Sequence, residues 1–160
     1  MSSAAGQTGS QAQPPRVLGA YLQAEKPVRI VVSTGKRKTS IARAVIKPGK
    51  GRVWVNGVPL ELWPIEMARL KMMEPVLIAG EDIMGGIDIR VTVSGGGYMS
   101  QADAVRMAIA RGLVAYTGSE ELRKIFEEYD RSMLAGDPRR TEPEKPMRRS
   151  ARRRWQKSYR

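Results

Sequence analysis

The sequence predicts an α+β domain in which helices cover one face of a mixed β-sheet, followed by an extended basic tail. Three observations lead to this prediction. Short β-branched segments come first along the chain, a strictly alternating strand then leads into a long helix, and a further helix follows. The last 26 residues contain ten Lys or Arg and three acidic residues. We therefore expect a flexible extension at 1–24, a globular domain at 25–134 and the tail at 135–160.

The first part of the domain is expected to contain three strands. Apolar and β-branched residues dominate 28–33 and 40–46, and the basic insert at 36–38, Lys-Arg-Lys, separates the two segments. The first strand is expected to end before this insert. A turn signal rich in Pro and Gly at 48–51 leads into a third strand at 52–55.

A helix and the most regular strand follow. Pro64 suits the first position of a helix, and Pro75 is expected to end that helix because proline lacks the N–H that a helix interior needs. From Ile87 to Ser94 apolar and polar residues alternate strictly, which is typical of a strand with one buried face. In this pattern Asp88 lies on the polar, exposed face.

Two more helices are expected to complete the domain. Ser100 is a natural N-cap for a helix whose apolar residues recur at helical spacing as far as Leu113. Ser119 supports another helix start, and this last helix is expected to run to about Leu134. The segment 136–138, Gly-Asp-Pro, then breaks it.

Basic residues are concentrated at the two ends of the chain. Residues 41–134 contain twelve basic and twelve acidic side chains, whereas the first forty residues contain six and one. Together with the tail, these excesses give a formal net charge of +12. A neutral body with basic, poorly foldable ends indicates a polyanionic partner.

The composition also narrows the possible chemistry. The chain contains neither cysteine nor histidine, which excludes disulfides, thiolate metal sites and the commonest general base. The acidic residues show no paired spacing typical of a catalytic site. We therefore expect no enzyme activity, no cofactor, no metal and no small-molecule substrate. No apolar run approaches the length of about 18 residues that a membrane span needs, so we expect a cytoplasmic protein without a membrane partner.

Two glycine-containing segments superficially resemble nucleotide-binding loops. The segment 34–40 fails as a phosphate loop, because Ile30 stands in place of the first glycine and Arg37 in place of the final Ser or Thr. The glycine turn 95–97 fails as a dinucleotide motif, because Ser100 replaces its last glycine. Two interpretations of the glycine turn stay open: a tight strand-to-helix connection, or a set of backbone amides that bind an RNA phosphate.

Both the basic insert and the tail favour phosphate binding. The insert could be a solvated hairpin tip, but three adjacent cations repel one another unless an anion neutralises them. The tail combines arginine with Trp155 and Tyr159, and such side chains grip phosphates and stack on bases. Three prolines, Pro138, Pro143 and Pro146, favour an extended tail, which suits irregular RNA better than the major groove of DNA.

Three motifs then occur together in one order along the chain: Gly35–Ala44, Gly95–Ala102 and Gln156–Arg160. With these motifs the sequence resembles the family of small-subunit ribosomal protein nine, and the similarity extends from about Val28 to Arg160. The ending Lys-Ser-Tyr-Arg and the segments 129–131 and 137–143 are similar to the archaeal and eukaryotic branch, and the archaeal form is the closer likeness. Residues 1–24 have no counterpart that we recognise in the family.

The resemblance implies a fold like the second domain of ribosomal protein five, with a left-handed crossover, and a place in the head of the small subunit. It implies three partners: small-subunit ribosomal RNA, neighbouring ribosomal proteins, and the anticodon stem-loop of transfer RNA in the peptidyl site. The residues implied to contact transfer RNA are Lys157, Ser158, Tyr159 and Arg160. Those implied to bind ribosomal RNA are Lys36, Arg37, Lys38, Thr39, Arg43, Gly95, Gly96, Gly97, Arg139, Arg140, Lys145, Arg148, Arg149, Arg152, Arg153, Arg154, Trp155 and Gln156.

Two other functions compete with a structural role on the ribosome. The protein subunit of the ribonuclease that processes transfer RNA shares this fold class, so an accessory subunit of a ribonucleoprotein enzyme is an alternative that predicts stimulated RNA cleavage. A free-standing enzyme that uses the turn 95–97 for a phosphorylated substrate lacks a base or nucleophile.

Overall fold

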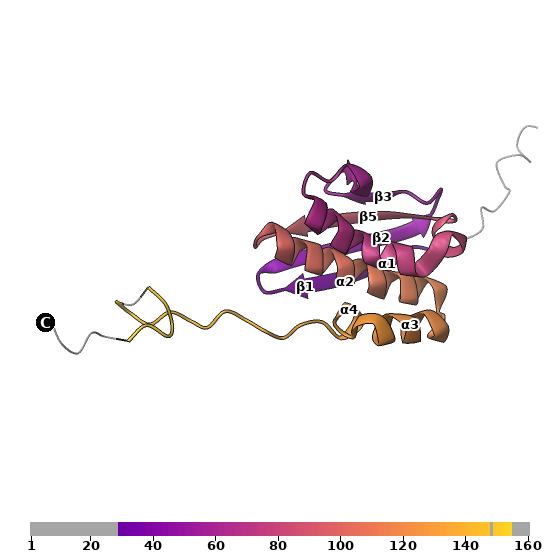
Figure 1. Cartoon of the computed structure of the whole chain (residues 1–160). Helices are drawn as coiled ribbons and strands as arrows, with labels where there is room; N and C mark the ends of the chain where they lie inside the picture. Colours follow the sequence, from indigo (N-terminus) through magenta and orange to yellow (C-terminus); the bar gives the residue numbers. More distant parts are fainter. Residues whose placement is uncertain (1–28, 148, 155–160) are drawn as a thin grey trace, which may run out of the picture.

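The computed structural model describes residues 29–147 and 149–154, and in this part of the chain a five-stranded sheet is covered by helices (Figure 1). The strands are β1 (Val31–Arg37), β2 (Ser40–Pro48), β3 (Val53–Val55), β4 (Val58–Pro59) and β5 (Ile87–Ser94). They lie in the order β1-β2-β5-β3-β4. Only β3 and β5 pair in parallel, whereas the other neighbours are antiparallel. The predicted mixed sheet is confirmed.

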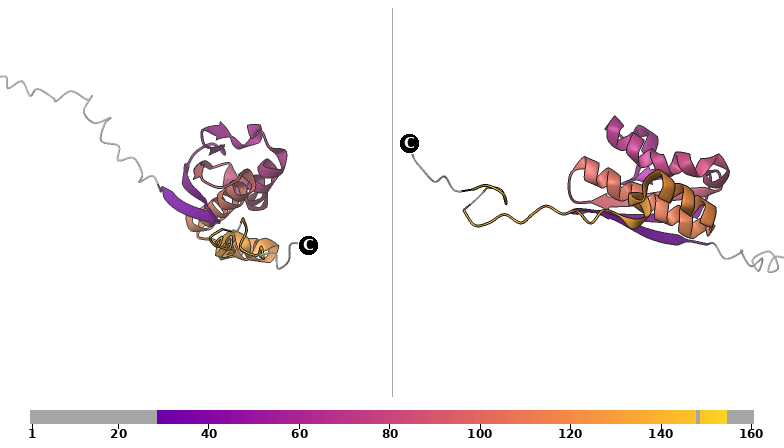
Figure 2. Two further views of the ribbon diagram at one scale, coloured as in Figure 1. Left: turned by 90° about the vertical axis from the view of Figure 1, so that its left-hand side faces the viewer. Right: turned by 60° about the horizontal axis from the view of Figure 1, so that its bottom comes forward.

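All helices lie on one side of this sheet. They are η2 (Leu60–Leu62), α1 (Glu66–Met84), α2 (Tyr98–Thr117), α3 (Glu120–Asp130) and α4 (Ser132–Ala135). Helix α2 packs across β1 and β2, with α1 beside it, and α3 and α4 lie along its other side. In the right-hand view of Figure 2 the described residues leave the opposite face of the sheet uncovered. The prediction of helices on one face is therefore confirmed.

The core between the sheet and α2 depends on small residues. Alternate side chains of β2 and β5 point into it, among them Ala42, Ala44 and Ile46. A Cβ at Gly35 would lie 2.0 Å from the carbonyl oxygen of Ala104 on α2. The backbones of β1 and α2 therefore touch, and only glycine fits at this point of β1.

Strand β1 is longer than predicted. It runs through Gly35 to Arg37, which pairs with Ser40 on β2, so only Lys38 and Thr39 connect the two strands. Lys38 has a φ of 52°, in the left-handed region that suits a two-residue hairpin turn. Two residues of the basic insert, Lys36 and Arg37, therefore belong to the strand and only Lys38 to the turn, because pairing with β2 continues past the glycine.

Helix α1 does not end at Pro75, so that prediction is wrong. The helix begins at Glu66 and continues to Met84, with a break at Gly80, where φ is 79° and ψ is 166°. Pro75 is buried on the same side as Met72, Ala79 and Met84. Burial of this apolar side keeps the helix going although proline cannot donate to the preceding turn.

Asp88 was expected on the exposed face of β5 but is buried. Its carboxylate accepts hydrogen bonds from the backbone N–H groups of Lys50 at 2.9 Å and Arg52 at 3.2 Å, and from the Arg52 side chain at 3.1 Å. These bonds, the Lys50 bond above all, lower the pKa of Asp88 to about 2 although burial opposes the shift. Asp88 therefore anchors the turn between β2 and β3.

The predicted helix starts are close to those observed. Ser119 precedes α3, and its hydroxyl accepts a hydrogen bond from the backbone N–H of Leu122 at 3.3 Å, as an N-cap does. Helix α2 begins at Tyr98, before Ser100, and the Ser100 hydroxyl accepts from the backbone N–H of Gly97 at 3.1 Å. Ser100 therefore stabilises the helix start from within the first turn.

Candidate nucleic-acid interface

The basic hairpin and the glycine turn, two of the three sequence motifs, are in direct contact. The Ser40 hydroxyl donates to the carbonyl oxygen of Gly95 at 2.8 Å and lies 3.1 Å from the Ser100 hydroxyl. Ser40 is fully buried. These contacts fix the hairpin tip, Lys38 and Thr39, against the N-terminal end of α2.

Packing against the hairpin explains two of the three glycines in the turn. Gly95 and Gly96 have φ values of 78° and 66°, which L side chains rarely adopt. A Cβ at Gly95 would lie 2.5 Å from the carbonyl oxygen of Thr39, and a Cβ at Gly96 would lie 2.2 Å from the Ser40 hydroxyl. The tight strand-to-helix connection is therefore sufficient reason for both glycines.

The third glycine, Gly97, is compatible with the second interpretation of the turn, in which its backbone amides bind an RNA phosphate. A Cβ at Gly97 would meet nothing within 4 Å. Gly97 lines a shallow hollow of about 350 Å³ together with Arg37 and Lys38 from the hairpin and the first turn of α2. Asp103 also lines this hollow, and its carboxylate is paired with Arg37 and Lys71. A cationic side chain and a helix N-terminus at one hollow suit an anion, so phosphate contact near Gly97 stays a prediction.

The third motif, the tail, leaves the body beside the same hairpin. The Arg111 guanidinium on α2 donates to the carbonyl oxygens of Leu134 at 2.8 Å and Ala135 at 3.3 Å, where α4 ends. It also donates to the carbonyl oxygen of Thr34 on β1 at 3.0 Å. One arginine thus connects β1, α2 and the start of the tail.

Arg37 holds the first residues of the tail by ion pairs. Its guanidinium lies 2.8 Å from the carboxylate of Asp137 and 3.6 Å from that of Asp103, and only 14% of its side chain is exposed. Lys71 on α1 approaches Asp103 at 2.6 Å. Because Arg37 is occupied by carboxylates of its own chain, its effect on RNA is expected to come through the position of the tail.

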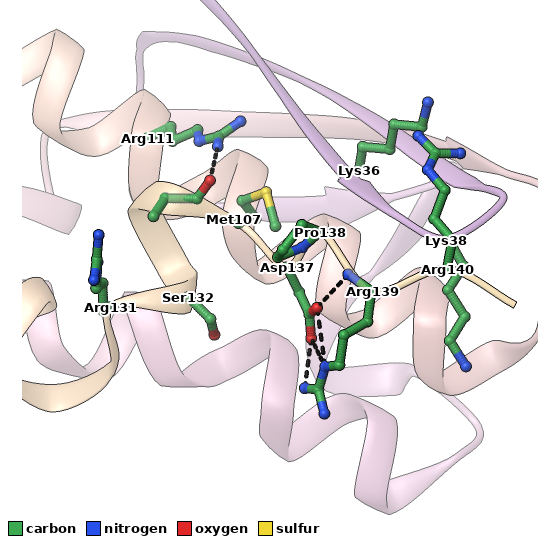
Figure 3. A pocket seen from close by; sticks show the side chains of 12 residues that line it. Lys36, Lys38, Met107, Arg111, Arg131, Ser132, Asp137, Pro138, Arg139 and Arg140 are labelled. Carbon is green, nitrogen blue, oxygen red and sulfur yellow. Dashed lines mark hydrogen bonds and ion pairs between the residues drawn. The ribbon is translucent and has the colours of Figure 1, made fainter.

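A cleft of about 800 Å³ opens between the hairpin, α2 and the start of the tail, and is called here the tail-root cleft (Figure 3). Its charged lining residues are Lys36, Lys38, Arg111, Arg131, Asp137, Arg139 and Arg140. Figure 3 shows Arg139 bonded to Asp137, the single acid among the lining residues. Cationic residues from three distant parts of the chain line this cleft. Such a cluster is suited to bind phosphate groups.

The described part of the tail continues away from the body without helix or strand (Figure 1). Arg152 forms an ion pair with Glu142 at 2.7 Å, which links two points of the tail, and 85% of its side chain is exposed. The predicted RNA-binding residues with exposed side chains here are Arg139, Arg140, Lys145, Arg149, Arg152, Arg153 and Arg154. Arg148, Trp155, Gln156 and the predicted transfer RNA residues Lys157, Ser158, Tyr159 and Arg160 lie outside the described residues.

Two differences separate this interface from the predicted set. Arg43 is exposed on the uncovered face of the sheet and does not line the tail-root cleft. Conversely, Arg111 and Arg131 line the cleft but were not predicted. Each stands on or between helices among residues of both signs, so no charge run in the sequence marks it.

The described residues contain neither a candidate metal site nor a helix suited to span a membrane. Within 29–147 and 149–154, no group of three or more His, Cys, Asp or Glu side chains could hold a metal ion. None of the described helices has both the length and the apolar character to cross a membrane.

The attachment of the tail is expected to depend on pH through Asp137. Hydrogen bonds from the side chain and backbone N–H of Arg139, with attraction to Arg139 and Arg37, lower the pKa of Asp137 from 3.8 to about 2. A lowered pKa stabilises the folded state above about pH 4, and this contribution disappears as the pH falls towards 2. We predict that Asp137→Asn lowers the melting temperature at pH 7 and that the difference from the parent chain shrinks between pH 4 and pH 2.

The control for this experiment is Asp82→Asn. Asp82 is exposed on α1 and its side chain has no hydrogen bond or ion pair with any other described residue, so its variant should melt like the parent chain throughout. A melting difference for Asp137→Asn that stays constant down to pH 2 would contradict the assigned role.

Sequence comparison now identifies the family. The family described as Ribosomal protein S9/S16 matches residues 35–160, a range that contains the hairpin, the glycine turn and the tail. The chain belongs to this family. The resemblance to ribosomal protein nine is therefore confirmed.

The S9 relatives that are most informative come from archaea. The small ribosomal subunit protein uS9 of Aeropyrum pernix is 67% identical over 147 residues, which covers 82% of this chain and 97% of that protein. The uS9 protein of Desulfurococcus amylolyticus is 65% identical over 133 residues, with 83% and 94% covered. That of Saccharolobus solfataricus is 62% identical over 132 residues, with 82% and 96% covered. These matches confirm the archaeal type of S9 protein.

Proposed function

We propose that this S9-family chain is a structural, non-catalytic component of the small ribosomal subunit. Its hairpin, tail-root cleft and tail bind ribosomal RNA in the subunit head, beside neighbouring ribosomal proteins. Its last four residues, 157–160, contact the anticodon stem-loop of transfer RNA in the peptidyl site. The protein would accordingly be bound to the ribosome during translation.

One observation carries the proposal: cations from distant parts of the chain meet at the place where the tail leaves the body. Lys36 and Lys38 come from the hairpin, Arg111 from α2, and Arg139 and Arg140 from the tail. An enzyme would need a base or nucleophile at such a cleft, but its lining offers chiefly cations. Phosphate binding is the chemistry that this lining supports best.

The mechanism is electrostatic and geometric. Lysine and arginine neutralise closely packed phosphates and release counterions, so the affinity for RNA should fall steeply with salt, by about 0.7 to 0.9 in log–log slope for each phosphate. The ion pairs of Arg37 and the hydrogen bonds of Arg111 set the direction in which the tail leaves. A fixed root allows a long tail to reach RNA far from the body.

Deletion of residues 157–160 tests the contact with transfer RNA. We expect small subunits to assemble at near-normal yield but to bind transfer RNA in the peptidyl site about a hundredfold more weakly, because two charge-assisted contacts are lost. Subunit yield is measured on sucrose gradients, and transfer RNA affinity by filter binding to the purified subunits.

The control is a chain in which the same four residues are present in scrambled order. If only the charge of these four residues matters, the scrambled chain should bind transfer RNA as tightly as the parent chain. If their order matters, it should bind transfer RNA as weakly as the deletion variant. Failure of subunit assembly after the deletion would instead assign these residues to ribosomal RNA.

A further inference from the structure

The face of the sheet turned away from the helices is uncovered (Figure 2) and is called here the open sheet face. It carries cations that do not line the tail-root cleft. Strand register places Arg43 on β2 opposite Thr92 on β5, and Arg90 on β5 opposite Trp54 on β3. Lys47 follows Arg43 at the same face of β2. In an antiparallel pair such diagonal neighbours are about 7–8 Å apart, so Arg90 lies close to both β2 cations.

The charges of the neutral body are sorted between its two layers. Residues 29–59 and 87–97, which contain the strands, hold nine basic side chains and a single acid, Asp88. Residues 60–86 and 98–135, which contain the helices, hold eleven acidic and seven basic side chains. Because Asp88 is buried and bonded to its own turn, the described open sheet face presents cations without an exposed acid.

A tryptophan organises part of this surface. The guanidinium carbons of Arg52 and Arg90 lie 4.9 Å and 5.3 Å from the centre of the half-buried Trp54 ring. The ring attracts both cations and limits their movement. Because the Arg52 guanidinium also donates to the buried Asp88 carboxylate at 3.1 Å, it is the Arg90 guanidinium whose N–H groups stay available. Beyond their backbone pairing in the sheet, the side chains of Arg90 and Arg43 form no hydrogen bond or ion pair with any other described residue. Two exposed cations without a carboxylate partner, of which Arg90 is held by the Trp54 ring, indicate an anionic partner outside the chain.

We propose that the open sheet face binds a second segment of RNA, distinct from the RNA at the tail-root cleft. Arg43, Lys47 and Arg90 contact its phosphates, and the stack of Arg52, Trp54 and Arg90 packs against its sugars or bases. The inference rests on the proposed binding of ribosomal RNA. An acidic protein would also match the charge, but planar forks beside an aromatic ring match phosphates and bases better.

Binding of the full chain to purified small-subunit ribosomal RNA, measured over a series of salt concentrations, tests the inference. We expect Arg43→Gln with Arg90→Gln to reduce the log–log salt slope by about 1.5 and the affinity at least tenfold. The matched control, Arg123→Gln with Lys124→Gln on α3, removes the same charge from the helical layer and should leave both values unchanged. Trp54→Leu should weaken binding several-fold without changing the slope, and thermal melting of each variant checks its folding.

The results distinguish failure of this inference from failure of the proposed function. If the parent chain binds RNA with no salt dependence, the proposed function fails and the inference fails with it. If the parent chain has a steep slope but the sheet and control variants behave alike, only the inference is overturned.

A crosslinking experiment distinguishes RNA from protein as the occupant. The chain has no cysteine, so Thr92→Cys, exposed opposite Arg43, can carry a single photo-crosslinker in small subunits assembled with the variant. A crosslink to ribosomal RNA is expected, and crosslinks to protein alone would overturn the proposal.

Discussion

Removal of residues 139–160 is expected to lower the affinity for ribosomal RNA at low salt by about a thousandfold, and to reduce the salt slope by about 5. This segment holds ten basic side chains and two acidic ones. If six or more of the ten neutralise phosphates, their counterions account for most of the binding free energy. The measurement is filter binding of the truncated and full chains across a salt series.

The truncated chain should still fold, because α4 ends at Ala135 and the buried core lies entirely before the tail. A tail of identical composition in scrambled order is the control, and it should keep the salt slope because counterion release depends on charge rather than order. An unchanged slope after truncation would mean that the body alone makes the RNA contacts.

Substitution of Gly35 by alanine should lower the free energy of unfolding by about 3 kcal/mol and the melting temperature by about 10 °C or more. The added Cβ would lie 2.0 Å from the carbonyl oxygen of Ala104 and 2.7 Å from the backbone nitrogen of Ala108. Both atoms belong to the backbone of α2, so no side chain can move aside and β1 must separate from the helix. Thermal and urea unfolding of the purified chain measure the effect.

Gly86→Ala is the matched control for this substitution. A Cβ at Gly86 would meet nothing within 4 Å, and its φ lies outside the left-handed region. This variant should therefore unfold at nearly the parent temperature. Equal melting of both variants would contradict the close contact of β1 with α2.

Local patterns in the sequence predicted most of the fold correctly. Strict alternation from Ile87 to Ser94 predicted the exact span of β5, because each apolar side chain there faces the core. The N-cap at Ser119 placed the start of α3 correctly. Such signals act within a few residues, and at these two elements the tertiary contacts agree with them.

Features that depend on contacts between distant segments could not be predicted from local patterns. Pro75 was expected to end α1, but burial of its apolar side outweighs the missing hydrogen bond. Asp88 alternates like an exposed residue, yet the turn at Lys50 covers it. The separation of basic residues in the sheet from acidic residues in the helices could not be predicted either. The twelve basic and twelve acidic residues of 41–134 give no net charge when they are counted together.

The sequence predicted which motifs form the candidate site, but not how the folded chain brings them together. The sequence marked the cations of the hairpin and tail, which the structure brings together at the tail-root cleft. It did not mark Arg111, whose hydrogen bonds to Thr34 and Leu134 require the folded chain. Nor did it show that Arg37 would be occupied by Asp103 and Asp137.

The most direct test of the central claim is sucrose-gradient fractionation of cell lysate after a high-salt wash, with the chain detected across free, small-subunit, large-subunit and joined-ribosome fractions. We predict that the chain remains with the small subunit and with joined ribosomes through the wash. A free pool, or association that the wash removes, would contradict a structural role in the subunit and would favour an accessory RNA-binding factor.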